Sequence, residues 1–193
     1  MSEMKLIYKG KYNGDPTSLP SREHFQGAVK FKEFDNPKEL GKFMNRIAIF
    51  TMVIGLVGFW FRVGIGAFSI LGGLCAIFVV PFPHELLHAI CFKKEVYLYT
   101  NLKDGMLFVV GPEAMSKARF IIMSLLPNIV FGLIPYIIFL INPNYSFLGT
   151  LGFLAIGMGA GDYYNVYNAV TQMPKGARTY LYQFNSYWYV PEK

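Results

Sequence analysis

The chain has 193 residues, of which 53% are hydrophobic and 16% are charged, whereas soluble domains contain about 25% charged residues. The apolar residues are grouped in long runs, which indicates a membrane protein and excludes an ordinary soluble domain. The net charge is +6, but Lys and Arg flank the apolar runs in the pattern that orients membrane proteins. We therefore expect the lipid bilayer, and not nucleic acid, as a partner.

The first membrane span is expected in a helix that begins at Pro37 and runs to Phe61. Asn36 is a suitable N-cap, and proline is favoured at the first helical position. The apolar part of this helix is slightly short for a span of about 20 residues. Lys42 and Arg46 can extend it, because their long side chains can reach the interface.

A second apolar run covers residues 63–80 and ends at two prolines, Pro81 and Pro83. Proline disfavours helical geometry in the residue before it, so we expect Val80 and Phe82 to leave the helix. A new helix then opens at Pro83, and it carries the polar motif considered below.

The segment between the second and third spans predicts a β-hairpin. Residues 96–102 and 106–110 flank Lys103, Asp104 and Gly105, and an Asp-Gly step favours a tight turn. The alternating segment 28–34 could add a strand to a small cytoplasmic sheet with this hairpin.

Two further spans are expected in the second half of the chain. Residues 120–141 form the third span and contain Pro127, and residues 147–170 form the fourth and contain Asp162. The aromatic side chains after this point are typical of the membrane interface.

The distribution of Lys and Arg predicts the topology of these four spans. Nine precede the apolar part of the first span, residues 47–61, and one lies between the first and second spans. Five lie between the second and third spans, none lies between the third and fourth, and three follow the fourth. Basic and nearly uncharged segments therefore alternate, which places both termini in the cytoplasm.

The predicted fold class is mainly α, a polytopic membrane protein with about four transmembrane helices and a small cytoplasmic β-hairpin or sheet. We expect one domain. Its parts are a cytoplasmic N-terminal segment (1–40), a four-span core (41–170) and a cytoplasmic tail (171–193).

The polar motif is His84-Glu85-Leu86-Leu87-His88. Two histidines four residues apart project from one face of a helix, so both imidazoles can reach a single metal ion. In metalloproteases the glutamate takes a proton from the water that the metal activates, and later donates it to the leaving amine. Ionisable side chains next to hydrocarbon are costly and rare without a function. The motif therefore predicts a metal-dependent hydrolase.

A catalytic zinc site needs a third protein ligand. Asp162 is the first candidate, because it is the only acidic residue besides Glu85 within the predicted spans. Cys91 and Glu113 are the alternatives, whereas His24 belongs to the polar N-terminal segment.

Two asparagines can support the site. Asn128 follows Pro127, which frees backbone groups. Its amide either satisfies the helix backbone or a neighbouring polar group, or binds the substrate backbone or oxyanion. Asn165 lies one turn after Asp162, so it can orient that carboxylate as a supporting hydrogen-bond partner.

The motif after a Pro-rich break, the proline in the next span and Gly161-Asp162 in the last together resemble the small bacterial zincin peptidases. The resemblance extends from Pro83 to about Pro191. It implies zinc bound by His84, His88 and Asp162, with Glu85 catalytic. These peptidases are similar to the site-2 proteases, which cleave transmembrane segments and whose third ligand is followed by glycine, whereas Tyr163 follows it here.

We therefore predict a zinc-dependent intramembrane or juxtamembrane endopeptidase that holds one Zn²⁺ per chain and acts on a membrane protein or peptide. The similarity to site-2 proteases implies that substrate could add a strand to the sheet edge of the 96–110 hairpin. A hairpin that only caps the helices is equally compatible with the sequence. The alternative is a non-catalytic membrane protein with a structural metal site or a partner-binding role. A metal transporter is a third hypothesis, and iron or cobalt suits such ligands as well as zinc.

Overall fold

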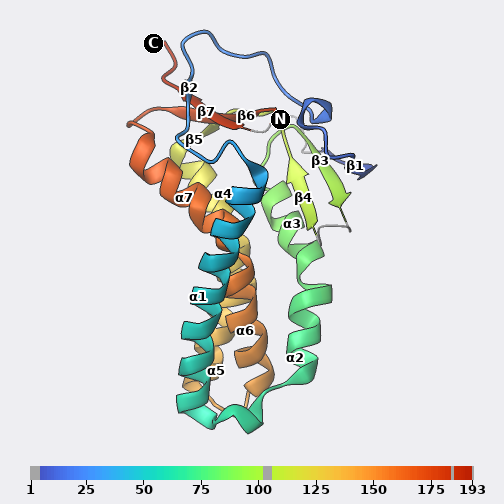
Figure 1. Ribbon diagram of the computed structural model, residues 1–193, viewed down its shortest axis with the longest axis vertical. Helices are drawn as coiled ribbons and strands as arrows, with labels where there is room; N and C mark the ends of the chain where they lie inside the picture. The colour runs from blue at the N-terminus through green and yellow to red at the C-terminus, as the bar shows by residue number, and fades with distance from the viewer. Residues whose placement is uncertain (1–4, 102–105, 184, 193) are drawn as a thin grey trace. The chain divides into compact units, whose positions relative to one another are not determined.

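The computed structural model describes residues 5–101, 106–183 and 185–192 (Figure 1). The chain divides into two compact units. The helical unit comprises Asn36–His84 and Ser124–Tyr164, and the mixed unit comprises Met1–Asp35, Glu85–Met123 and Asn165–Lys193. The mainly helical fold class with small sheets is confirmed.

The helical unit is built from successive, mostly apolar helices. They are α1 (Pro37–Val63), the 3-10 turn η2 (Ile65–Ala67), α2 (Ile70–Leu74), the π-helical η3 (Cys75–Val79) and η4 (Asn128–Leu133), α5 (Ile134–Ile141) and α6 (Ser146–Met158). Helices α3 (Pro81–Ala89), α4 (Lys117–Pro127) and α7 (Ala160–Gln172) contribute residues to both units.

Helix α1 begins as the sequence predicts. The Asn36 side chain accepts a hydrogen bond of 2.9 Å from the backbone N–H of Lys38, and this satisfies one of the unpaired donors of the first turn. The helix ends at Val63, where Gly64 follows with a φ of 73°. Glycine adopts this left-handed conformation without steric cost, so it terminates the helix.

Helix α6 packs against α1, α2 and α5 (Figure 1). Phe59, Phe139 and Phe153 form a buried cluster between them. A Cβ on Gly152 would lie 2.7 Å from the backbone nitrogen of Tyr136, so the glycine allows α5 and α6 to approach closely. Such small residues are typical of helix packing in membranes.

Within the described residues, two helices are long and apolar enough to cross a membrane, Lys38–Val63 and Lys117–Ile141. The pair Ile70–Val79 and Pro81–Ala89 is bent by 44° and would be a third span if it crosses as one. Only 11% of the most apolar window of the first span is buried inside the protein. Few side chains of this window are therefore buried in the protein, as is typical of a helix that faces lipid.

The prediction of about four transmembrane helices is not confirmed by the described helices. In the second predicted span, 63–80, the end of α1 and the turn η2 occupy the first residues, so the helix begins only at Ile70. The fourth predicted span, 147–170, is divided at Gly159 into α6 and α7.

The prediction that Val80 and Phe82 leave helical geometry is wrong. Val80 has φ −60° and ψ −37°, and α3 begins at Pro81 and includes Phe82. Both Pro81 and Pro83 lie in the first turn of α3, where the helix has no partner for an N–H group in any case. The chain therefore bends without leaving helical structure.

The strands β1 (Lys5–Lys11), β3 (Glu95–Asn101) and β4 (Met106–Val110) form one sheet of the mixed unit, in the order β1-β3-β4. The predicted pairing of β3 with β4 is confirmed, and it is antiparallel with Leu98 opposite Val109. The predicted turn at Lys103, Asp104 and Gly105 lies outside the described residues. The parallel pairing of β1 with β3 was not predicted.

The two edges of this sheet differ in their side chains. Among the described strands, β1 and β4 each have one neighbour. Strand β1 carries Lys5, Lys9 and Lys11, all exposed, whereas β4 has the uncharged sequence MLFVV.

A second sheet has the order β2-β7-β6-β5, with all pairs antiparallel. Its strands are β2 (Val29–Lys30), β5 (Met115–Ser116), β6 (Arg178–Tyr182) and β7 (Asn185–Tyr189). The strand expected within 28–34 is present as β2, but it pairs with β7 and not with the 96–110 hairpin. The aromatic tail, which the sequence assigns to the membrane interface, forms the paired strands β6 and β7, and its tyrosines alternate along them.

A buried cluster of Ala89, Phe92, Val96 and Met115 surrounds the C-terminal end of α3. The burial of these side chains stabilises the segment in which α3 ends and β3 begins. The last turn of the helix that carries the polar motif is thus packed against the core of the mixed unit.

Candidate metal site

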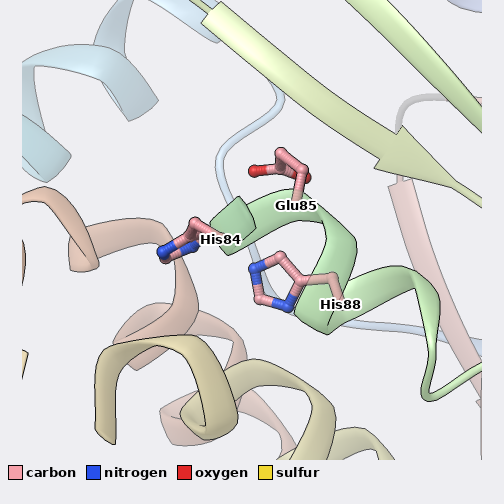
Figure 2. A group of neighbouring side chains, drawn as sticks. All are labelled: His84, Glu85 and His88. Carbon is pink, nitrogen blue, oxygen red and sulfur yellow. The ribbon is translucent and has the colours of Figure 1, made fainter. Parts of the chain in front are cut away.

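Helix α3 carries three side chains that could hold a metal ion. One potential ligand atom from each of His84, Glu85 and His88 lies within 4.8 Å of the other two. Figure 2 shows the three side chains on consecutive turns of α3. The helical spacing of four residues brings the two imidazoles to the same part of the helix surface.

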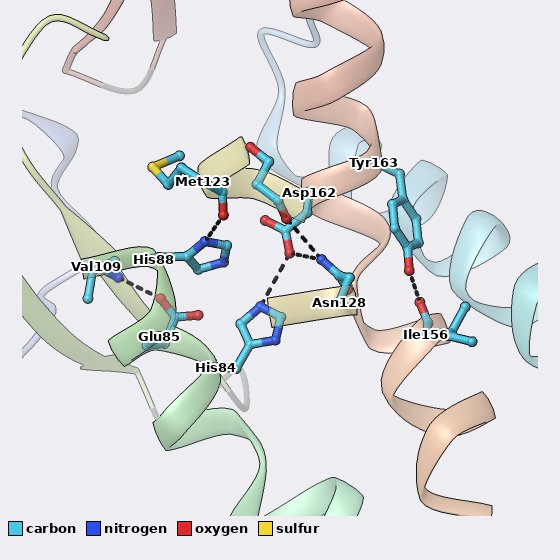
Figure 3. A network of polar contacts seen from close by, with 10 residues as sticks. His84, Glu85, His88, Val109, Met123, Asn128, Ile156, Asp162 and Tyr163 are labelled. Carbon is cyan, nitrogen blue, oxygen red and sulfur yellow. Dashed lines mark hydrogen bonds and ion pairs between the residues drawn. The ribbon is translucent and has the colours of Figure 1, made fainter. Parts of the chain in front are cut away.

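His88 is fixed by a main-chain group. Its Nδ1 lies 2.8 Å from the carbonyl oxygen of Met123 (Figure 3), and the side chain is buried, with 7% exposed. A carbonyl can only accept, so Nδ1 carries the hydrogen and donates it. The neutral ring then has its lone pair on Nε2, the atom that can bind a metal.

Pro127 explains why the Met123 carbonyl is suited to this contact. A residue at position 127 of a helix normally donates its N–H to the carbonyl four residues earlier, which is that of Met123. Proline has no N–H and cannot do so. The sequence analysis recognises that Pro127 frees backbone groups, but it assigns them to Asn128 and not to His88.

His84 contacts an acidic side chain within the helical unit. Its Nε2 lies 3.2 Å from Oδ2 of Asp162, and the two side chains are 16% and 14% exposed. Asp162 lies in the first turn of α7. The sequence expects this aspartate to act with the histidines, and the structure brings it to His84 (Figure 3).

Asn128 holds the same carboxylate. Its Nδ2 donates to Oδ2 of Asp162 at 2.7 Å and to the carbonyl of Ser124 at 3.0 Å. The side chain is 4% exposed. Of the two expected roles, contact with a neighbouring polar group is the one that these bonds provide.

Gly159 was not singled out by the sequence, yet its backbone contacts Asn128. A Cβ built on Gly159 would lie 1.6 Å from Oδ1 of Asn128, which no real pair of atoms can tolerate. Glycine is therefore required between α6 and α7 if Asn128 is to keep its position. The signal in the sequence is the run Gly157, Gly159 and Gly161 just before Asp162.

Glu85 is fixed by the backbone of strand β4. Its Oε2 accepts a hydrogen bond of 2.9 Å from the N–H of Val109. Both residues lie in the mixed unit, so this hydrogen bond orients the carboxylate within that unit. Every residue except proline offers the same N–H group, so this donor could not be identified from the residue type at position 109.

The remaining candidates have other surroundings. Glu113 accepts hydrogen bonds from Arg119 at 2.6 Å and from the backbone N–H of Lys93 at 2.7 Å. Burial by itself would raise the pKa of Glu113, but these donors outweigh it and lower the pKa below its usual value. Glu113 is thus an ion-pair partner in the mixed unit.

Cys91, His24 and Asn165 also lie outside the contacts described above. The Cys91 thiol is 3.5 Å from the carbonyl of Leu87. His24 Nδ1 lies 3.1 Å from the Tyr180 hydroxyl. Asn165 lies one turn beyond Asp162 in α7, but the amide that donates to Asp162 is that of Asn128.

The residues present fit a zinc ion. Imidazole nitrogen and carboxylate oxygen are ordinary zinc ligands, and two ligands of a tetrahedral ion, each about 2.0–2.1 Å from it, lie roughly 3.3 Å apart. The distance between His84 Nε2 and Asp162 Oδ2 is close to this value, at 3.2 Å. The lone pair that the Met123 contact leaves on Nε2 of His88 adds a second imidazole donor.

A comparison with protein families identifies one match. The family described as Putative zincin peptidase matches residues 77–178, a range that includes His84, Glu85, His88, Asn128 and Asp162. No curated protein and no solved structure matches the chain significantly.

Proposed function

Because this chain belongs to the Putative zincin peptidase family, we propose that it is a zinc-dependent endopeptidase that cleaves peptide bonds within or beside the membrane. The observation that carries the proposal is the group His84, Glu85 and His88 on α3. The preceding helix segment, Ile70–Val79, forms with α3 the bent pair that is apolar enough to count as a span. Because the three side chains lie on the second helix of this apolar pair, a substrate within or next to the membrane could reach them.

The proposed zinc ligands are His84, His88 and Asp162. When bound, the ion would act as a Lewis acid that activates water and polarises the scissile carbonyl. The Nδ1–H bond of His88 to the Met123 carbonyl holds its ring in the tautomer that ligation requires. Asn128 holds Oδ2 of Asp162 in place through its amide.

Glu85 is the proposed general base. The Val109 N–H holds its Oε2, and we assign proton transfer to this carboxylate. The carboxylate would take the proton from the attacking water and give it to the leaving amine. The carboxylate thus needs a fixed orientation, which the main chain of β4 provides.

The experiment that tests this function is Glu85→Gln in the purified, full-length protein. The variant should keep about one zinc per chain, as two imidazoles and one carboxylate suffice for a catalytic site. Proteolysis should fall about 10²–10⁴-fold, the usual contribution of a general base. Zinc content by atomic absorption and cleavage of a membrane-peptide substrate are the two measurements. Glu95→Gln, an exposed glutamate of β3, is the matched control, and undiminished cleavage by Glu85→Gln would refute the mechanism.

We further propose that the substrate binds as an added strand along β4. Val109 directs its N–H to Glu85 and therefore away from β3. Backbone groups alternate along an antiparallel strand, so Leu107 directs its N–H and carbonyl to the same edge. An added strand there would gain main-chain hydrogen bonds and lie next to Glu85.

Leu107→Pro tests this docking edge. Proline removes the N–H that faces away from β3, and it leaves the bonds between β3 and β4 in place. We expect KM for a peptide substrate to rise about tenfold, since one main-chain donor and its neighbours are lost, with zinc content unchanged. Unchanged KM in a folded variant would remove β4 from substrate binding.

A multi-pass topology with both termini in the cytoplasm completes the proposal. Its support is the alternation of basic and nearly uncharged segments along the chain. Reporters fused to each terminus, one active only in the cytoplasm and one only outside, measure the topology. External location of either terminus would contradict it.

A further inference from the structure

We propose that the mixed unit binds the phosphate of an anionic phospholipid in a pocket at the start of α4. The pocket has a volume of about 550 Å³ and is lined by residues of two segments, 116–121 and 175–178. Three of the lining residues, Lys117, Lys175 and Arg178, are cationic. This site is separate from the residues assigned to zinc and to proton transfer.

Strand pairing brings the two segments together. Ser116 of β5 is the antiparallel partner of Arg178 of β6. The backbone N–H of Lys117 donates to the carbonyl of Ala177 at 3.3 Å. Cations that are about sixty positions apart in the chain therefore line the same pocket.

The charge of the pocket suits an anion. Its lining contains no acidic residue. Lys175 and Arg178 are exposed, and within the described ranges neither forms an ion pair with a carboxylate. A pocket of about 410 Å³ also includes Arg178, but Glu113 lines it and makes it less suitable for an anion.

Lys117 is held in place at the pocket. Its Nζ donates to the carbonyls of Val170 at 3.1 Å and Met173 at 2.7 Å. An ammonium group has three donors, so one remains for a ligand. Arg178 can add a bidentate contact, because the guanidinium fork matches two phosphate oxygens.

A lipid, and not a free ion, is the occupant that the surroundings favour. The candidate membrane span Lys117–Ile141 begins at this pocket, and the end of a span lies at the level of the lipid headgroups. Ala118 and Ile121 give the pocket an apolar side next to its cations. Basic pockets beside transmembrane helices are suited to anionic headgroups for the same reasons.

Lipid binding to the full-length protein in detergent tests this site. Phosphatidylglycerol and phosphatidylcholine are titrated, and bound lipids are counted by native mass spectrometry. The wild-type protein should retain phosphatidylglycerol in preference to phosphatidylcholine. Lys175→Gln with Arg178→Gln should weaken its binding about tenfold or more, because each cation near an anionic headgroup contributes.

The matched control is Lys38→Gln with Arg46→Gln, which removes the same charge from exposed residues of α1. It should leave phosphatidylglycerol binding unchanged. A second variant, Ala118→Glu, keeps all three cations and adds a negative charge at an exposed lining residue, so it should also weaken binding.

Three outcomes would overturn the proposal. Equal loss in both double variants would mean that net charge, and not the pocket, attracts the lipid. No preference for phosphatidylglycerol in the wild type would exclude an anionic headgroup. Displacement of the lipid by millimolar inorganic phosphate would indicate a site for the free ion. None of these measurements depends on peptidase activity.

Discussion

In the helical unit, His84 is contacted by a side chain, the carboxylate of Asp162, which the amide of Asn128 holds in turn. In the mixed unit, Glu85 and His88 are contacted by main-chain groups, the N–H of Val109 and the carbonyl of Met123. Two halves of one motif are therefore oriented by two kinds of partner. Side-chain partners depend on residue identity, whereas main-chain partners depend on where the fold places the backbone.

This difference predicts how the site responds to substitution. A side-chain partner is lost with any change that removes its functional group. A main-chain partner survives most substitutions, and only proline or a displacement of the strand removes it. Changes in the helical unit should therefore reduce zinc affinity, and changes in β4 should reduce the rate of proteolysis with zinc retained.

The largest expected effect is that of Asp162→Ala. The substitution removes a proposed ligand, so zinc affinity should fall more than about 100-fold, beyond the 10–100-fold typical of supporting residues. Competition with a chromophoric chelator measures the affinity, and circular dichroism checks the fold. Asp35→Ala, at an exposed aspartate paired with Lys30, should have no effect. Equal zinc affinity in the wild type and Asp162→Ala would show that Asp162 only contacts His84 and does not bind the metal.

The next largest effect is expected for Gly159→Ala. The added methyl group would displace the Asn128 amide, and zinc affinity should fall about 10–100-fold as the carboxylate loses its support. Asn128→Ala should have a similar effect, and the double variant should be little worse than either. Gly161→Ala is the control, because a Cβ there meets no atom within 4 Å. If the losses of zinc affinity in the two single variants added up in the double variant, Gly159 would act independently of Asn128.

The smallest effect is expected for Val109→Pro. Proline removes the donor to Glu85 but keeps the pairing with β3, since this N–H faces away from it. The loss of a hydrogen bond to a charged group should reduce kcat about tenfold, with zinc content unchanged. Steady-state kinetics with zinc analysis measures both. A fall in zinc content equal to the fall in kcat would contradict the distinction between the two kinds of partner.

The same distinction explains what the sequence could predict. The histidine spacing, the helix start at Asn36 and the strand pairing around 96–110 follow from local patterns, and the structure has all three. Asp162 could be selected because acidic side chains in apolar segments are few. The Val109 and Met123 contacts could not be identified, because every residue offers the same backbone groups.

The predictions that differ from the structure concern the prolines of α3, the continuity of two spans and the pairing of β1. Pro81 and Pro83 predicted a break in the helix, but both fall in the first turn of α3, where they are tolerated. The apolar composition of 63–80 and 147–170 predicted continuous spans, whereas the turns at Gly64 and Gly159 interrupt them. The pairing of β1 with β3 joins segments far apart in the chain, for which a single sequence carries no local signal.

The lysines of the edge strand β1 affect which edge of the sheet can pair with another polypeptide strand. Exposed Lys5, Lys9 and Lys11 discourage another chain from pairing there, because each new strand would have to bury or displace a solvated charge. Strand β4 has no such barrier. An incoming polypeptide would therefore pair with the sheet along β4 and not along β1.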